Sequence, residues 1–156
     1  MVVAITLVVG ATLLGVSLNV PPGSTVFYVL TFALAATWVV GGFASGPLHL
    51  GRIQYKGELR RPIIVPILLG LAVAALFIVG AVVVREIAPL REMTEDVLAF
   101  ARYGSLPLVA VITLVNGIAE EIFFRGALFA AIGVWHPVAI STTVYALTTV
   151  ATGNPM

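Results

Sequence analysis

The stretch Asn116-Gly-Ile-Ala-Glu120-Glu121-Ile-Phe-Phe-Arg125 lies inside an apolar run that extends over residues 106–134. A helix that crosses a bilayer needs about 20 mostly apolar residues, so this run is long enough to span one. A charged group at the centre of such a helix costs roughly 2.5 to 3.5 kcal/mol. Three charged groups so close together therefore predict that they pair, face a polar cavity, or take part in a reaction.

The composition of the whole chain indicates a membrane protein. Hydrophobic residues make up 60% of the 156 residues and charged residues only 10%, which excludes an ordinary soluble domain. A net charge of +1, without clusters of Lys and Arg among aromatic residues, predicts no nucleic-acid partner. The chain has no cysteine, which excludes disulfides, thiolate metal ligands and a cysteine nucleophile.

The apolar pattern predicts an all-α, polytopic membrane helix bundle of about five spans, folded as a single transmembrane domain over residues 1–156. The first span is expected to be an uncleaved helix, because no Lys or Arg precedes Arg52. Residues 85–105 mix charged and apolar side chains, which predicts a short amphipathic helix on the membrane surface. The predicted spans are 2–20, 25–44, 63–84, 106–134 and a last one that begins near Val138.

The loops predict the orientation in the cell membrane. Loop 46–62 holds four basic residues, against three in the more acidic segment 85–105. The positive-inside rule therefore places loop 46–62 and the amino terminus in the cytoplasm. His49 is expected to be solvated in this loop, and His136 to be an interfacial residue beside a proline break.

Helical geometry separates the two glutamates. Glu121 and Arg125 are four residues apart, so they share one face and are expected to form an ion pair. Glu120 points onto the stripe that holds Asn116 and Phe124, where no cation of its own helix reaches it. A carboxylate so placed can take a proton from water and later return it. Asn116 is a possible lining residue of the site. Two other readings stay open: the charges only tie helices together, and Asn116 is an interhelical hydrogen-bonding residue.

The spacing Glu-Glu-x-x-x-Arg at Glu120, Glu121 and Arg125, inside a hydrophobic helix and followed by Gly126, resembles the CAAX protease and bacteriocin-processing family. This group, also called the abortive-infection family, includes the type II CAAX prenyl endopeptidases. The resemblance covers about the last third of the chain. It implies an intramembrane endopeptidase, surrounded by membrane lipid, that cleaves a hydrophobic or prenylated peptide or protein. It also implies that Glu120 is the base that acts on the hydrolytic water, that Glu121 and Arg125 order the site, and that no metal or cofactor is needed.

The family's other motifs are only partly matched. Its second motif is an aromatic residue, three others and a histidine, and its nearest equivalent here is Tyr145-Ala-Leu-Thr-Thr149, which ends in threonine. The third motif, His-x-x-x-Asn or Asp, lies in later helices of the family and does not occur before Met156. The chain is therefore expected to be a truncated or divergent member. In the first case it lacks the C-terminal helices of the family fold.

The same antiparallel geometry predicts which residues of the last span line the site. Positions equally far from the turn at 135–137 face each other, so Glu120 is expected at the depth of Thr149, and Arg125 near that of Tyr145. Both residues of the last span are possible lining residues. A threonine can hydrogen-bond water but cannot carry a proton as an imidazole does.

Three functions remain open. The first is the glutamate-type endopeptidase. The second is a catalytically inactive family relative that acts as a membrane immunity or regulatory factor. The third is a small transporter or proton relay whose buried carboxylates are protonation sites. Peptide turnover that depends on Glu120 distinguishes the first function. The second predicts no turnover but a fold that depends on Arg125. The third predicts ion flux into liposomes that depends on Glu120. An oligomer or helper subunit is left open.

Overall fold

The computed structural model describes residues 1–21, 23–102 and 105–151. Two compact units form: unit 1 consists of Met1–Leu50 and Ala101–Met156, and unit 2 of Gly51–Phe100. Apart from one short hairpin in unit 2, the regular structure in the described residues is helical. The predicted all-α bundle of apolar helices is confirmed, and the single domain stays a prediction.

The helices of unit 1 begin and end at recognisable residues. The Ser24 hydroxyl caps the second helix by accepting the Phe27 N–H at 3.1 Å. Gly133, with φ +74, follows the penultimate helix, and Pro137 is the first residue of the last one. In chain order the helices of unit 1 are α1 (Val2–Leu18), α2 (Thr25–Ala44), α5 (Leu106–Glu120), the π-helix η1 (Glu121–Leu128), α6 (Phe129–Ile132) and α7 (Pro137–Ala151).

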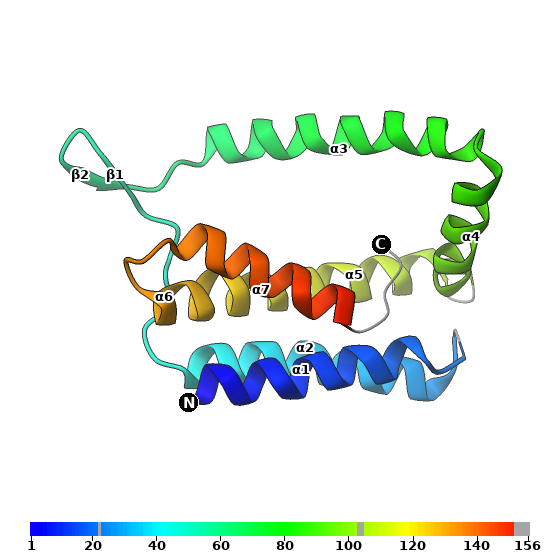
Figure 1. Ribbon diagram of the computed structural model, residues 1–156, viewed down its shortest axis with the longest axis horizontal. Helices are drawn as coiled ribbons and strands as arrows, with labels where there is room; N and C mark the ends of the chain where they lie inside the picture. Colours follow the sequence, from blue (N-terminus) through cyan, green and yellow to red (C-terminus); the bar gives the residue numbers. More distant parts are fainter. Residues whose placement is uncertain (22, 103–104, 152–156) are drawn as a thin grey trace. The chain divides into compact units, whose positions relative to one another are not determined.

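Five apolar helices correspond to the five predicted spans. In the described residues, three are long and apolar enough to cross a membrane: α2, α3 (Ile64–Arg85), and the continuous helix Leu106–Ile132 made of α5, η1 and α6. The helices α1 and α7 are apolar but shorter. Within unit 1, α1 and α2 run side by side, and α7 runs back along α6 and η1 (Figure 1).

The core of unit 1 lies where α2 packs against α5 and η1. Trp38 of α2 is 1% exposed, and its ring centroid lies 4.7 Å from that of Phe123 and 5.1 Å from that of Phe124. The two phenylalanine rings meet edge to face, an arrangement that the ring quadrupoles favour. The buried hydrophobic residues are Leu34, Ala35, Trp38, Ala119, Phe123, Phe124, Ala127 and Leu128.

Two glycines allow α1 and α2 to approach closely. A Cβ atom on Gly10 would lie 2.1 Å from the Trp38 ring, and one on Gly41 would lie 2.2 Å from the Thr6 side chain. The hydrophobic effect does not drive helices together in lipid. Small residues at these positions instead allow close van der Waals packing between the two helices.

Gly10→Ala is expected to lower the free energy of unfolding by about 1–3 kcal/mol, because the new methyl group must displace the Trp38 ring. Unfolding in mixed detergent micelles, titrated with sodium dodecyl sulfate, measures the change. The matched control is Gly117→Ala in α5, where a Cβ meets nothing within 4 Å. An equal response of both variants would contradict the tight contact.

Unit 2 contains a hairpin and two helices. Strands β1 (Ile53–Tyr55) and β2 (Glu58–Arg60) are antiparallel, and the turn residues Lys56 and Gly57 both have positive φ, as in a type I′ turn. The sequence predicts only a polar loop here, because strands of three residues are too short to show periodicity. The helix α3 has no buried residue within the described structure, and α4 (Ala88–Arg102) forms where the amphipathic helix is predicted.

Candidate functional site

The Glu-Glu-x-x-x-Arg motif lies where an α-helix becomes a π-helix. Glu120 is the last residue of α5, and Glu121 is the first residue of η1. A π-helix closes i→i+5 hydrogen bonds, is rare, and occurs frequently at functional sites. Its wide turn lets most of its apolar side chains reach the core while the charged side chains of Glu121 and Arg125 stay outside.

Glu121 and Arg125 form the predicted ion pair. The Arg125 guanidinium donates a hydrogen bond from Nη1 to Oε1 of Glu121. Their side chains are 57% and 66% exposed respectively, so the rest of the described chain leaves them largely uncovered. An arginine paired in this way keeps further N–H donors for another partner, because a guanidinium carries five.

Glu120 has a different partner. It is half-buried, and its Oε2 accepts a hydrogen bond from the hydroxyl of Tyr145 on α7 at 3.3 Å. The Tyr145 ring is held in turn by an edge-to-face contact with Phe124, at a centroid distance of 5.0 Å. Among the residues that the structure describes, no cation lies within salt-bridge distance of Glu120. The two adjacent carboxylates therefore differ as the sequence predicts: one is paired with a cation and the other is not.

The hydrogen bond to Glu120 comes from one turn earlier on α7 than the depth argument predicts. Equal distance from the turn predicts Thr149 opposite Glu120 and Tyr145 opposite Arg125. In the structure Tyr145 lies beside Arg125 and also reaches Glu120, because a tyrosine side chain extends across about one helical turn of 5.4 Å. The Thr149 hydroxyl donates to the Tyr145 carbonyl oxygen at 3.0 Å. A role of Thr149 in lining the site stays a prediction.

Asn116 lies one turn before Glu120 and carries an unused acceptor. Its Nδ2 donates to the Ile112 carbonyl oxygen at 3.0 Å, a bond within its own helix. Its Oδ1 is buried and has no hydrogen-bond partner among the described residues. A buried acceptor without a partner costs about 1–3 kcal/mol. This atom therefore suits a water or substrate group that donates a hydrogen bond.

A small cavity lies between η1 and α7 beside the motif. Its volume is about 50 Å³, enough for one or two waters at about 30 Å³ each. Ser141 and Thr142 contribute to it, although neither is among the residues that the sequence predicts at the site. The available signal was the helical spacing, because Ser141 precedes Tyr145 by four residues and shares its face. The cavity is lined by Phe124, Arg125, Ser141, Thr142 and Tyr145.

The loop after α2 packs on the far end of the motif helix. The His49 N–H donates to the Gly126 carbonyl oxygen at 3.0 Å, and its imidazole lies 4.4 Å from the Phe129 ring. The expectation that His49 is solvated is therefore wrong: it is half-buried, because the chain turns back at Gly46, where φ is +116. The part of the chain that the structure describes contains no group of three or more His, Cys, Asp or Glu side chains that could hold a metal ion.

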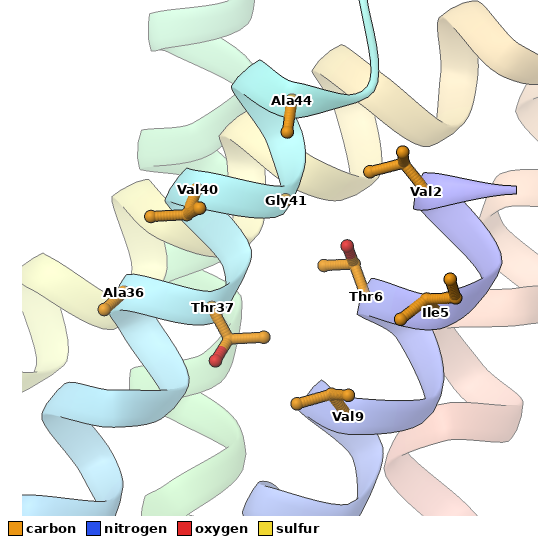
Figure 2. A pocket seen from close by; sticks show the side chains of 9 residues that line it. All are labelled: Val2, Ile5, Thr6, Val9, Ala36, Thr37, Val40, Gly41 and Ala44. Atoms are coloured by element: carbon orange, nitrogen blue, oxygen red, sulfur yellow. The ribbon is translucent and has the colours of Figure 1, made fainter.

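A second, larger hollow is an open apolar groove of about 420 Å³ between α1 and α2 (Figure 2). It contains no charged side chain, and it is formed by neither α5, η1 nor α7. It is therefore separate from the candidate site. Its lining consists of Val2, Ile5, Thr6, Val9, Ala36, Thr37, Val40, Gly41 and Ala44.

A comparison with protein families identifies the segment that holds the motif. Residues 102–155, about a third of the chain, match the family model described as type II CAAX prenyl endopeptidase Rce1-like. The segment that holds the motif is therefore similar to the CAAX proteases. The matched segment includes the Glu120–Tyr145 hydrogen bond, the Glu121–Arg125 pair and the small cavity. The apolar helices of the chain and this similarity to the CAAX proteases together indicate a membrane protein. No curated protein and no solved structure matches the chain.

Proposed function

We propose that this CAAX protease relative is an intramembrane endopeptidase in which Glu120 is the general base. The observation that carries the proposal is the unequal treatment of the two carboxylates. Glu121 is neutralised by Arg125, whereas Glu120 accepts a neutral hydrogen bond from Tyr145 and has no cation within salt-bridge distance among the described residues. Oxygen lone pairs of Glu120 remain for a water molecule, since a carboxylate has about four acceptor sites.

The proposed reaction needs only water besides the peptide. Glu120 takes a proton from the water while the oxygen of the water attacks the carbonyl carbon. The π electron pair of the C=O bond moves onto the carbonyl oxygen. When the C–N bond breaks, Glu120 returns the proton to the leaving amine. The Glu121–Arg125 pair keeps a positive group next to the negative charge that develops on the substrate, where preorganised charge is most effective.

The position of the motif supports a substrate that enters from the membrane. Glu120 lies 14 residues after Leu106 and 12 before Ile132, about 21 Å and 18 Å along an α-helix, and therefore near the middle of the span. A hydrophobic or prenylated peptide can reach this depth, whereas a polar peptide must leave water at a high cost. We therefore assign a hydrophobic or prenylated peptide or protein as the substrate.

Glu120→Gln is expected to lower kcat by about 10²- to 10⁴-fold, because glutamine keeps the shape of the side chain but cannot accept the proton. The purified protein in detergent, with a fluorogenic prenylated peptide, gives the rate. Glu86→Gln, at the end of α3, is the matched control and should cleave at the wild-type rate. Equal turnover by wild type and Glu120→Gln would remove Glu120 as the base.

A catalytically inactive relative with an immunity or regulatory role is the second candidate. The observation in its favour is Thr149, which stands where the family motif has a histidine. In that case the wild-type protein turns over no peptide, while Arg125 is still needed for the fold.

The proposed orientation in the cell membrane predicts opposite labelling of two loops. Leu50 and Ser105 are exposed and lie at opposite ends of the helix Leu106–Ile132, since the loop at His49 packs on Gly126. The chain has no cysteine, so Leu50→Cys and Ser105→Cys each provide a single thiol. In intact cells an impermeant maleimide should label Ser105→Cys and spare Leu50→Cys until the cells are opened. The reverse pattern would place the amino terminus outside.

A further inference from the structure

We propose that the cavity between η1 and α7 binds the carbonyl oxygen of the scissile peptide bond and stabilises the oxyanion that forms on it. This inference rests on the proposed function and assigns a second half of the same site. The cavity has about 50 Å³ of space, which suits one oxygen atom and a water but no side chain.

The walls of the cavity supply the donors that an oxyanion needs. Arg125 has N–H groups beyond the one given to Glu121, and the side chains of Ser141, Thr142 and Tyr145 each carry one hydroxyl. Phe124 forms an apolar wall of the cavity, and a new negative charge interacts more strongly with these groups beside an apolar wall than it would in bulk water.

The hydroxyl of Ser141 is held only loosely in the structure. Ser141 is 8% exposed, and its Oγ donates to the Val138 carbonyl oxygen at 3.3 Å, which is long for an O–H···O bond. A substrate oxygen that carries negative charge is a better acceptor than this carbonyl. The hydroxyl is therefore expected to turn into the cavity when the substrate binds.

Tyr145 joins the two halves of the site. Its hydroxyl donates to Glu120, while the residue also lines the cavity that contains Arg125. This arrangement places the water on the Glu120 side and the carbonyl oxygen on the Arg125 side of one phenol. An acyl-transfer site requires such a position, from which the reacting carbon is reached by both the nucleophile and the oxyanion donors.

The Tyr145 hydrogen bond can change partner during the reaction. Once Glu120 has taken the proton of water, it carries an O–H and no longer needs a donor. Protonated Glu120 then donates to the phenol oxygen, and the phenol hydrogen becomes available to the oxyanion. Collapse of the intermediate reverses this exchange, so that the proton of Glu120 is released to the leaving amine.

The test is the binding of a hydrophobic peptide phosphinate, whose tetrahedral anionic group mimics the oxyanion. The variants Ser141→Ala, Thr142→Val and Tyr145→Phe each remove one hydroxyl, and Tyr145→Phe keeps the ring on Phe124. Each is expected to weaken phosphinate binding at least tenfold and to lower kcat with little change in KM, as loss of one oxyanion donor lowers kcat by about 10²- to 10³-fold in a well-studied protease.

The matched control is Thr148→Val, which removes a hydroxyl of α7 that bonds its own helix at Val144 and does not line the cavity. Its phosphinate affinity and kcat should stay within twofold of wild type. If all variants bound the phosphinate with equal affinity, or if the wild-type protein did not bind it, the cavity would not be the oxyanion site.

The two proposals fail separately in this experiment. Phosphinate binding that depends on Ser141, without peptide turnover, supports the pocket and overturns the peptidase. Turnover that depends on Glu120 but is indifferent to Ser141, Thr142 and Tyr145 supports the peptidase and overturns the pocket.

Discussion

Arg125→Gln is expected to lower the free energy of unfolding by about 2.5–3.5 kcal/mol, the cost of one uncompensated charge at the centre of a bilayer helix. Arg125 is the ion-pair partner of Glu121, and Glu121 lies near the middle of the helix Leu106–Ile132. Neutral glutamine leaves the Glu121 carboxylate without its counter-charge. Steric trapping or a detergent unfolding titration in bicelles measures the loss.

The double variant Glu121→Gln/Arg125→Gln is the decisive control, because it removes both charges together. It should recover most of the stability that Arg125→Gln loses. Arg60→Gln, which breaks the exposed Arg60–Glu58 pair of the hairpin, should cost less than about 1 kcal/mol, as solvated ion pairs do. A double variant as unstable as Arg125→Gln would show that the pair is not what stabilises the helix.

Trp38→Ala is expected to cost about 3–5 kcal/mol, the range for removal of a large buried aromatic side chain. Trp38 is 1% exposed and contacts the rings of Phe123 and Phe124 at the start of the π-helix. The cavity left behind removes dispersion contacts that lipid cannot restore. Turnover should fall as well, because Phe124 supports the ring of Tyr145. Thermal unfolding and the peptide assay measure the two effects.

Trp135→Ala provides the comparison for Trp38. Trp135 lies between α6 and α7 and is 74% exposed, so its loss should change stability by less than about 0.5 kcal/mol. Trp38→Phe should be milder than Trp38→Ala, because Nε1 of Trp38 makes no hydrogen bond within the described residues. Similar losses in Trp38→Ala and Trp135→Ala would place the packing centre elsewhere.

The helices could be predicted closely from apolar length and breaking residues. The span predicted at 106–134 is the helix Leu106–Ile132, and Gly133 ends it by adopting a positive φ. The span predicted at 25–44 is α2 with the same bounds, because Ser24 is an effective N-cap. These features depend on neighbouring residues alone, and therefore sequence periodicity reveals them.

The π-helix could not be predicted in this way. The residues of η1 have an ordinary helical pattern, and the i→i+5 geometry agrees with the packing of Phe123 and Phe124 around one side chain of α2. The inward position of Gly126 against Leu48 is likewise a contact with a distant loop. The geometry of η1 therefore depends on contacts with residues far away in the sequence, which a short stretch of sequence does not reveal.

The same distinction separates the parts of the candidate site. The Glu121–Arg125 pair joins residues four apart on one helix, so its geometry follows from the helical repeat. The Glu120–Tyr145 hydrogen bond joins residues 25 apart, and the cavity with Ser141 and Thr142 needs two helices. Their register depends on where the chain turns after Gly133 and how far each side chain extends.

By itself, the sequence determined that this chain is a bundle of apolar helices with one charged motif inside a span. It also determined that Glu121 has a cation on its own helix and that Glu120 has none there, because this follows from the helical repeat. Only the tertiary structure decided that Tyr145 is the partner of Glu120, that His49 packs on Phe129, and that a donor-lined cavity opens beside the motif. The reason is physical: contacts between helices depend on their relative rotation, depth and side-chain reach, which are properties of the packed bundle and of no single segment.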